Sequence, residues 1–273
     1  MERLLRRTSH CDRMPLVLLT VIIAARNATN WLQQCLDSVD DQRLPFGWDL
    51  RIMVGIDNCP ATLDIACGLR MPRLSVYYFG RHVGPYIIFN SLATRICSDA
   101  LARFDADDVM LSGYLKAQIA LLNHRYSPTI TQTWSIYADS SLMPIAAHLA
   151  DGSCTSVDGR RLRPSDGQFM MTCAVWNRLG GFQPWWCHAD TEFMRRARWA
   201  GIQRSVVPEH LYLRRVHNSS LTSSKHTGYS SEIRNYYKEQ IRVARESYAN
   251  GIAPPTLSPV VSNSIEVSTC SLL

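Results

Sequence analysis

The chain has 273 residues, of which 46% are hydrophobic and 19% are charged, enough for one large domain or two closely packed halves. The net charge of +6 is modest and suits an anionic small substrate. The sequence has no nucleic-acid-binding motif and no interleaving of aromatic with basic residues, which argues against nucleic acid as a partner. The longest apolar stretch, Pro15–Ala25, is too short to cross a bilayer, so we expect no transmembrane segment.

Nine cysteines are present, an odd number, and no two are spaced as Cys-x-x-Cys. Several lie in apolar surroundings, where a free thiol behaves as a small hydrophobic side chain. This usage is typical of reduced thiols rather than of a disulfide framework or a zinc site, and it predicts a cytoplasmic protein.

Apolar runs of strand length alternate with helical spacing through the first part of the chain. The predicted strands of this part are Leu16–Ala24, Asp49–Ile56, Leu74–Phe79 and Asp99–Phe104, and the predicted helices are Thr29–Val39, Thr62–Leu69 and Gly84–Ser98. Continuous apolar strands are the mark of a parallel sheet covered on both faces. The alternation therefore predicts an α/β fold with a mostly parallel central sheet.

The second part of the chain is less regular. Its predicted strands are Ile130–Tyr137, Phe169–Trp176 and, last, Ser205–Val216, and its predicted helices are Tyr114–Leu122, Asp190–Trp199 and Ser231–Tyr248. The arginines of Asp190–Trp199 are expected on the outer face of that helix. Asp139–Asp166 is expected to be a loop. We expect an N-terminal tail (1–14), one domain (15–225) with halves 15–108 and 109–225, a C-terminal helix (226–252) and a Pro- and Ser-rich, disordered tail (253–273).

Asp105, Asp107 and Asp108 crowd together where the fourth predicted strand ends. Ligands of open α/β sheets bind outside the carboxyl ends of the strands. Crowded carboxylates raise one another's pKa unless a cation lies between them, and oxygen ligands suit Mg²⁺ or Mn²⁺. The alternative is that Asp107 or Asp108 only caps a helix that begins at Val109.

Several landmarks in a fixed order resemble the family 2-like glycosyltransferases of the GT-A fold, which are inverting enzymes that use nucleotide sugars. The landmarks are Val21–Asn27 followed by Trp31–Val39, Asp57, Asp105–Asp108, Gly180–Phe182 followed by Asp190–Phe193, and His217 followed by Ser219–Thr222. The resemblance implies a Rossmann-like, mostly parallel central sheet flanked by helices, with a less regular acceptor-binding half. Asn58–Thr62 departs from the family's usual Gly-Ser-x-Asp, and Ala189-Asp190 replaces the frequent Glu-Asp pair.

The resemblance also implies roles for individual residues. The metal ligands would be Asp105, Asp107 and His217, and the nucleotide-sugar contacts would be Ala25, Arg26, Asn27, Asp57, Arg81, Gly84, Asp105 and Ala106. Asp190 would be the catalytic base, with Glu192 as the other candidate, unless Asp190 only caps its helix while Glu192 pairs with Arg195 or Arg196. Trp185 and Trp186 would either stack on a sugar ring or pack in the core.

The resemblance predicts transfer of a sugar from a nucleoside diphosphate sugar, with UDP-sugar as the best candidate, to a hydroxyl group. The acceptor would be a glycan, a lipid-linked molecule or a protein. A nucleotidyltransferase also uses paired acids and a divalent ion, but the segment after the first strand lacks the Gly-rich phosphate loop that such an enzyme would show. A non-catalytic module that binds nucleotide sugars is the other alternative, because one fold serves many functions.

Overall fold

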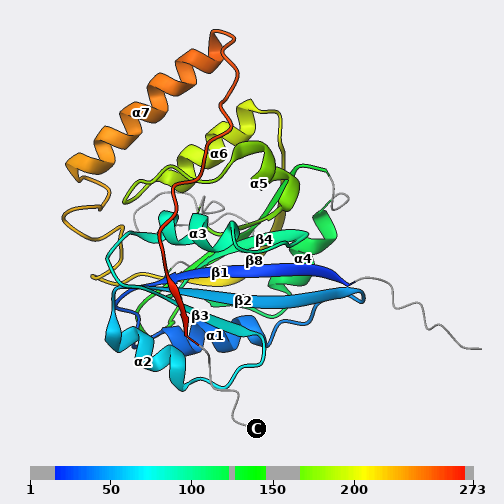
Figure 1. Ribbon diagram of the computed structural model, residues 1–273, viewed down its shortest axis with the longest axis vertical. Helices are drawn as coiled ribbons and strands as arrows, with labels where there is room; N and C mark the ends of the chain where they lie inside the picture. Colours follow the sequence, from blue (N-terminus) through cyan, green and yellow to red (C-terminus); the bar gives the residue numbers. More distant parts are fainter. Residues whose placement is uncertain (1–15, 123–126, 146–166, 268–273) are drawn as a thin grey trace, which may run out of the picture.

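The computed structural model describes residues 16–122, 127–145 and 167–267. Within these residues the strands form one nine-stranded sheet in the order β5-β8-β6-β7-β4-β1-β2-β3-β9, with helices on both faces (Figure 1). The expected α/β sheet flanked by helices is confirmed. The predicted tail over residues 1–14 and most of the predicted loop Asp139–Asp166 lie outside the described residues.

Four neighbouring strands form a parallel block at the centre of the sheet. They are β1 (Val17–Ala25), β2 (Trp48–Asp57), β3 (Leu74–Phe79) and β4 (Ala100–Asp105). Their runs of apolar, often β-branched residues are buried on both faces, as parallel strands require. The register aligns Ala25 with Ile56 and Ala24 with Asp105, so Asp57 and Asp105 emerge at the same edge.

The other half of the sheet mixes strand directions. β7 (Phe169–Thr172) runs antiparallel between β4 and β6 (Thr129–Ala138), and β8 (Gln203–Arg215) runs parallel to β6. The short strand β5 (Val109–Met110) pairs antiparallel with β8. Because Val109 is paired with Leu213, this pairing brings the end of β8 beside the acidic segment 105–108.

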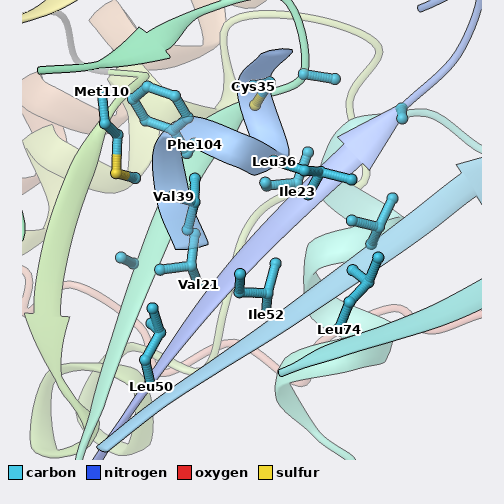
Figure 2. Close-up of a cluster of buried hydrophobic side chains, with 14 of the residues drawn as sticks. Val21, Ile23, Cys35, Leu36, Val39, Leu50, Ile52, Leu74, Phe104 and Met110 are labelled. Atoms are coloured by element: carbon cyan, nitrogen blue, oxygen red, sulfur yellow. The ribbon is translucent and has the colours of Figure 1, made fainter. Parts of the chain in front are cut away.

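Two hydrophobic clusters cover the two faces of the sheet. Helices α1 (Leu32–Asp40), α2 (Pro60–Gly68) and α4 (Tyr114–Leu121) pack into one cluster, and α3 (Pro85–Ala93), α5 (Cys173–Leu179) and α6 (Ala189–Trp199) pack into the other. Figure 2 shows α1 lying over Val21 and Ile52 in the first cluster. Helix α7 (Glu232–Ala249) packs on α6, outside the second cluster.

Three sequence predictions in the second half need correction. Phe169–Trp176 is a strand only as far as Thr172, after which the chain turns into α5. Val109 begins strand β5 rather than a helix, and α4 starts after Gly113, whose φ is +86°, so neither Asp107 nor Asp108 caps it. Arg196 was expected on the outer face of α6 but is 1% exposed.

The C-terminal segment is ordered where its composition predicted disorder. Residues Ile252–Val267 run back past α5 and α3 and end in β9 (Ile265–Val267), antiparallel to the edge strand β3, so β8 is not the last strand (Figure 1). The Leu257 N–H donates to the Leu179 carbonyl at 2.8 Å, and the Ser262 N–H to Ser91 Oγ at 2.8 Å. Backbone hydrogen bonds to distant segments hold this strap, and composition cannot reveal them.

No described helix is long and apolar enough to cross a membrane. The cysteines within the described residues that are free are Cys35, Cys59, Cys67, Cys97, Cys173 and Cys187. Cys35 and Cys187 are buried, in keeping with the expected role of reduced thiols as small apolar side chains.

Candidate active site

A cavity of about 340 Å³ opens at the carboxyl ends of β1, β2 and β4. Most of the predicted site residues line it: Ala25, Arg26, Asn27, Asp57, Asp105, Ala106, Asp107, Asp190 and His217. Arg81 and Gly84 do not line it. Arg81 is exposed, and Gly84 lies behind Asp57. The fold thus brings residues from both halves of the chain to one cavity.

Asp57 is buried at the nucleotide-half end of the cavity and is held by the loop that follows β3. Its carboxylate accepts hydrogen bonds from the Val83 N–H at 2.7 Å and the Gly84 N–H at 3.0 Å, and it contacts His82 Nδ1 at 2.7 Å. Arg26 donates to the Asp57 carbonyl at 2.7 Å, which ties the loop after β1 to the end of β2. Gly84 is required there because its φ is +85° and a Cβ would come within 3.1 Å of the Trp186 ring.

Asp107 and His217 form the pair nearest to a metal site. Asp107 Oδ2 lies 2.8 Å from His217 Nε2, and His217 Nδ1 lies 2.8 Å from Ser219 Oγ. The Trp31 ring packs against the imidazole at a centroid distance of 4.1 Å and fixes its plane. Trp31 and Ser219 thus orient the imidazole. A carboxylate oxygen and an oriented imidazole nitrogen are a donor pair that suits a divalent ion such as Mn²⁺ or Mg²⁺.

Asp105 and Asp108 have other partners. Gln168 Nε2 donates to Asp105 Oδ2 at 2.6 Å and to Asp108 Oδ2 at 2.7 Å, so one amide group bridges the two acids. Arg103 Nη2 contacts the second oxygen of Asp105 at 2.8 Å, and the Arg215 N–H donates to Asp108 Oδ1 at 2.9 Å. Burial raises the pKa of Asp108 well above its ordinary value, and the charges of Asp107 and Asp105 add to this shift.

The predicted three-residue metal group is not assembled in this geometry. Among the described residues, no three His, Cys, Asp or Glu side chains come together as a group that could hold a metal ion. Asp105 is turned toward Arg103 and Gln168, although burial still raises its pKa. Of the three predicted ligands, Asp107 and His217 are the two that lie in contact with each other.

Asp190 stands in the first turn of α6 and lines the cavity, whereas Glu192 does not. Asp190 Oδ1 accepts the Thr191 N–H at 2.7 Å. Glu192 is 6% exposed and is bound through both oxygens by Arg196, at 2.9 and 3.0 Å. The pairing of Glu192 with Arg196 is observed, and Asp190 is the one of these two acids that lines the cavity.

Sequence reasoning missed several residues around the acids. Arg103 had a signal, because it is a charged residue in a buried strand and lies two positions before Asp105, hence on the same face. Gln168 and Arg215 carried no such sequence signal, because their contacts depend on the pairing of β7 with β4 and of β8 with β5.

The tryptophans were expected to stack on a sugar or to pack in the core. Trp185 stacks on Tyr237 of α7 at 4.5 Å, and Trp186 lies 4.9 Å from His82. Neither side chain lines the cavity, so their observed contacts are with the protein itself.

Residues 20–184 match the model of the family described as Glycosyl transferase family 2. The chain belongs to this family. A search of curated protein sequences found no match. The resemblance noted from the sequence landmarks is thereby confirmed, and the cavity is the candidate active site of a glycosyltransferase.

Solved structures share the fold at low sequence identity. TarS 1–349 from S. aureus, solved in complex with UDP-GlcNAc, has a TM-score of 0.61 and 15% identity, covering 87% of this chain and 74% of its own. The mannosyltransferase PcManGT from Pyrobaculum calidifontis, in complex with GDP-Man and Mn²⁺, has a TM-score of 0.57 and 14% identity, covering 89% of this chain and 67% of its own. These likenesses establish the GT-A fold, and the roles of individual residues rest on the geometry of this chain.

Proposed function

We propose that the protein transfers a sugar, with inversion, from a nucleoside diphosphate sugar to a hydroxyl group of an acceptor. UDP-sugar is the proposed donor, and the acceptor is a glycan, a lipid-linked molecule or a protein. One observation carries the proposal: Asp57, the Asp107–His217 pair and Asp190 line the same cavity. The structures of TarS with UDP-GlcNAc and of PcManGT with GDP-Man support a nucleotide sugar as donor.

Asp57 is proposed to hold the nucleoside, because its carboxylate is fixed by two backbone N–H groups and still faces the cavity. A divalent ion, Mn²⁺ or Mg²⁺, held by Asp107 and His217 would neutralise charge on the departing diphosphate. Asp105, which Arg103 and Gln168 orient, would accept a hydrogen bond from a hydroxyl group of the nucleotide sugar rather than bind the ion directly.

Asp190 is proposed as the general base that accepts the proton of the acceptor hydroxyl. Asp190 stands in the first turn of α6, lines the cavity and is only partly buried. Tyr86 lies near it and stays protonated, since burial and the charge of Asp190 raise the pKa of the phenol well above its ordinary value. A single displacement, with base and leaving group on opposite sides of the anomeric carbon, inverts its configuration.

The test is a panel of nucleotide sugars with Mn²⁺ or Mg²⁺, scored for slow release of the free nucleotide. One UDP-sugar should be hydrolysed, and Asp107→Asn and His217→Gln should each lower the rate by at least about tenfold and weaken its dependence on the ion. Asp64→Asn, at an exposed site on α2, is the matched control and should keep the wild-type rate. Unchanged turnover and ion dependence in both cavity variants would contradict the proposal.

A further inference from the structure

Arg234 is a buried cation that faces the cavity with unused hydrogen-bond donors. It lies in the first turn of α7, is 6% exposed and lines the cavity. Its Nε donates to the Thr227 carbonyl at 2.7 Å, and its guanidinium lies over the Tyr229 ring at 5.3 Å. Neither Nη atom has a hydrogen-bond partner, and no acid pairs with Arg234, among the described residues.

Although most of the side chain is buried, its two Nη atoms keep contact with solvent in the cavity, so their free donors can bind an anion. Two exposed cations, Lys238 and Arg195, also act on His188, which lines the cavity two residues before Asp190. Lys238, one turn further along α7, is held by the Tyr229 carbonyl and by Asn235 Oδ1, each at 3.0 Å. Burial, together with the charges of Arg234, Lys238 and Arg195, lowers the pKa of His188 against the opposing effect of Asp190.

The position of Arg234 separates it from the diphosphate end of the cavity. The cations that act most strongly on Asp105 and Asp108 are Arg103 and Arg214. Arg234 instead acts on Cys187 and His188, directly before Asp190. The Trp186 N–H also contacts the Tyr237 hydroxyl of α7 at 3.5 Å, and Arg234 and His188 both line the cavity, so an anion at Arg234 would lie on the side of the proposed base Asp190.

We infer that Arg234 binds an anionic group, of phosphate or carboxylate type, carried by the acceptor. The inference rests on the proposed sugar transfer and adds that the acceptor is an acidic molecule whose reacting hydroxyl lies near its negative charge. A guanidinium can grip such a group through two parallel hydrogen bonds, with its Nε and its aromatic contact fixing the plane.

Sulfate is the probe, titrated into the full-length protein saturated with UDP and Mg²⁺ at constant ionic strength, with calorimetric readout. UDP fills the diphosphate position, so the titration reports a second anion site. Arg234→Gln should weaken sulfate binding at least about tenfold, while Arg234→Lys, which keeps the charge without the fork, should weaken it less. Arg242→Gln, at an exposed α7 arginine bound to Glu239 and Glu246, should bind as wild type does.

Equal sulfate affinity in wild type and Arg234→Gln would mean an adventitious ion only and would overturn the inference. So would a loss of UDP affinity in Arg234→Gln with sulfate binding intact, because the guanidinium would then serve the donor. Melting temperatures show whether each variant folds, and Arg234→Lys keeps the test valid should Arg234→Gln unfold. Failure of wild type to bind UDP would instead count against the proposed function. The inference could then still be tested, because sulfate binding by wild type and Arg234→Gln can be compared without UDP.

A second measurement identifies the acceptor as the source of the anion. UDP release from the hydrolysed donor is followed with paired acceptors that differ by one anionic group, such as glycerol and glycerol phosphate or glucose and glucuronate. The anionic member should accelerate release more in wild type, and the difference should shrink at least about tenfold in Arg234→Gln. Equal acceleration by both members in wild type would contradict the inference.

Discussion

The parallel half of the sheet and the mixed half contribute to the cavity in different ways. In the parallel half, Asp57 ends β2 and Asp105 ends β4. Both reach the cavity because parallel strands end at one edge of the sheet. In the mixed half, the side chains reach the cavity because distant strands pair with the parallel block and with β5. Gln168 directly precedes β7, which pairs with β4, and His217 follows β8, which pairs with β5. Local chain order thus positions Asp57 and Asp105, whereas contacts between distant segments position Gln168 and His217.

This difference teaches where the site is vulnerable. The acids at 105–108 lie at the junction of the halves and take partners from segments 60 to 110 residues away. Buried polar contacts of this kind stabilise only when complete, since an unpaired buried group costs about 1–3 kcal/mol. Variants that remove one partner of these contacts should therefore lower stability as well as alter the chemistry.

The largest effect is expected at Asp190. Asp190→Asn removes the base from the acceptor end but keeps the oxygen that accepts the Thr191 N–H. Sugar transfer should fall by about 10²–10⁴-fold while UDP affinity stays within about twofold, measured by nucleotide release and by calorimetry. Retained transfer would remove Asp190 from the mechanism, and a matched loss of UDP binding would contradict the division of labour between the halves.

Next in size is the buried ion pair of α6. Arg196 binds both oxygens of Glu192 and donates to the carbonyls of Leu179, at 2.5 Å, and Gly181, at 2.6 Å. Arg196→Ala leaves Glu192 buried and unpaired and should lower the free energy of unfolding by about 3–5 kcal/mol in urea titrations. Arg198→Ala, exposed on the same helix, should change it by less than about 0.5 kcal/mol. Equal effects would show that the pair does not stabilise the mixed half.

Two glycines outside the C-terminal strap, Ile252–Val267, test whether that strap is held against α5. Gly180 has φ +76°, and a Cβ there would lie 1.7 Å from the Leu257 carbonyl oxygen, whereas Gly201 has φ +70° and open space around it. Gly201→Ala should cost about 1–2 kcal/mol for the left-handed backbone alone, and Gly180→Ala about 1–3 kcal/mol more because the strap must move. Urea unfolding measures both values, and equal costs would mean that the strap is not held there.

The smallest effect is a pH dependence at His188. Its pKa is lowered from the ordinary 6.5, first by burial and then by Arg234, Lys238 and Arg195, so the folded state binds the proton less readily than the unfolded chain. The stability linked to His188 is therefore present above pH 6.5 and is lost as the pH falls below it.

The melting temperature of His188→Asn should fall less than that of wild type when the pH is lowered from 7.5 to 5.5. Asn tolerates the φ of +71° at this position, so the substitution removes the titrating group without straining the backbone. Identical pH profiles would exclude His188 as a contributor.

The sequence predicted the parallel half closely and the mixed half in part. β3 was predicted at its observed limits, and β1 and β2 to within a residue or two at each end, because buried parallel strands leave a continuous apolar pattern. The strand assigned to Phe169–Trp176 failed beyond Thr172, since buried residues of a short strand and a short helix have the same composition. The acids line the cavity as expected, but the contacts of Asp105 and Asp108 with Arg103 and Gln168 were not predicted.

The sequence by itself determined that Asp57, Asp105 and Asp107 would stand at one edge of an α/β sheet, because strand period and strand order are local properties. Only the tertiary structure decided that Gln168 bridges Asp105 and Asp108, that Arg196 pairs with Glu192, and that the C-terminal strap adds strand β9 beside β3. The buried guanidinium of Arg234 likewise emerges only from folding. These contacts join segments far apart in the chain, and no local pattern of residues encodes which distant group will arrive.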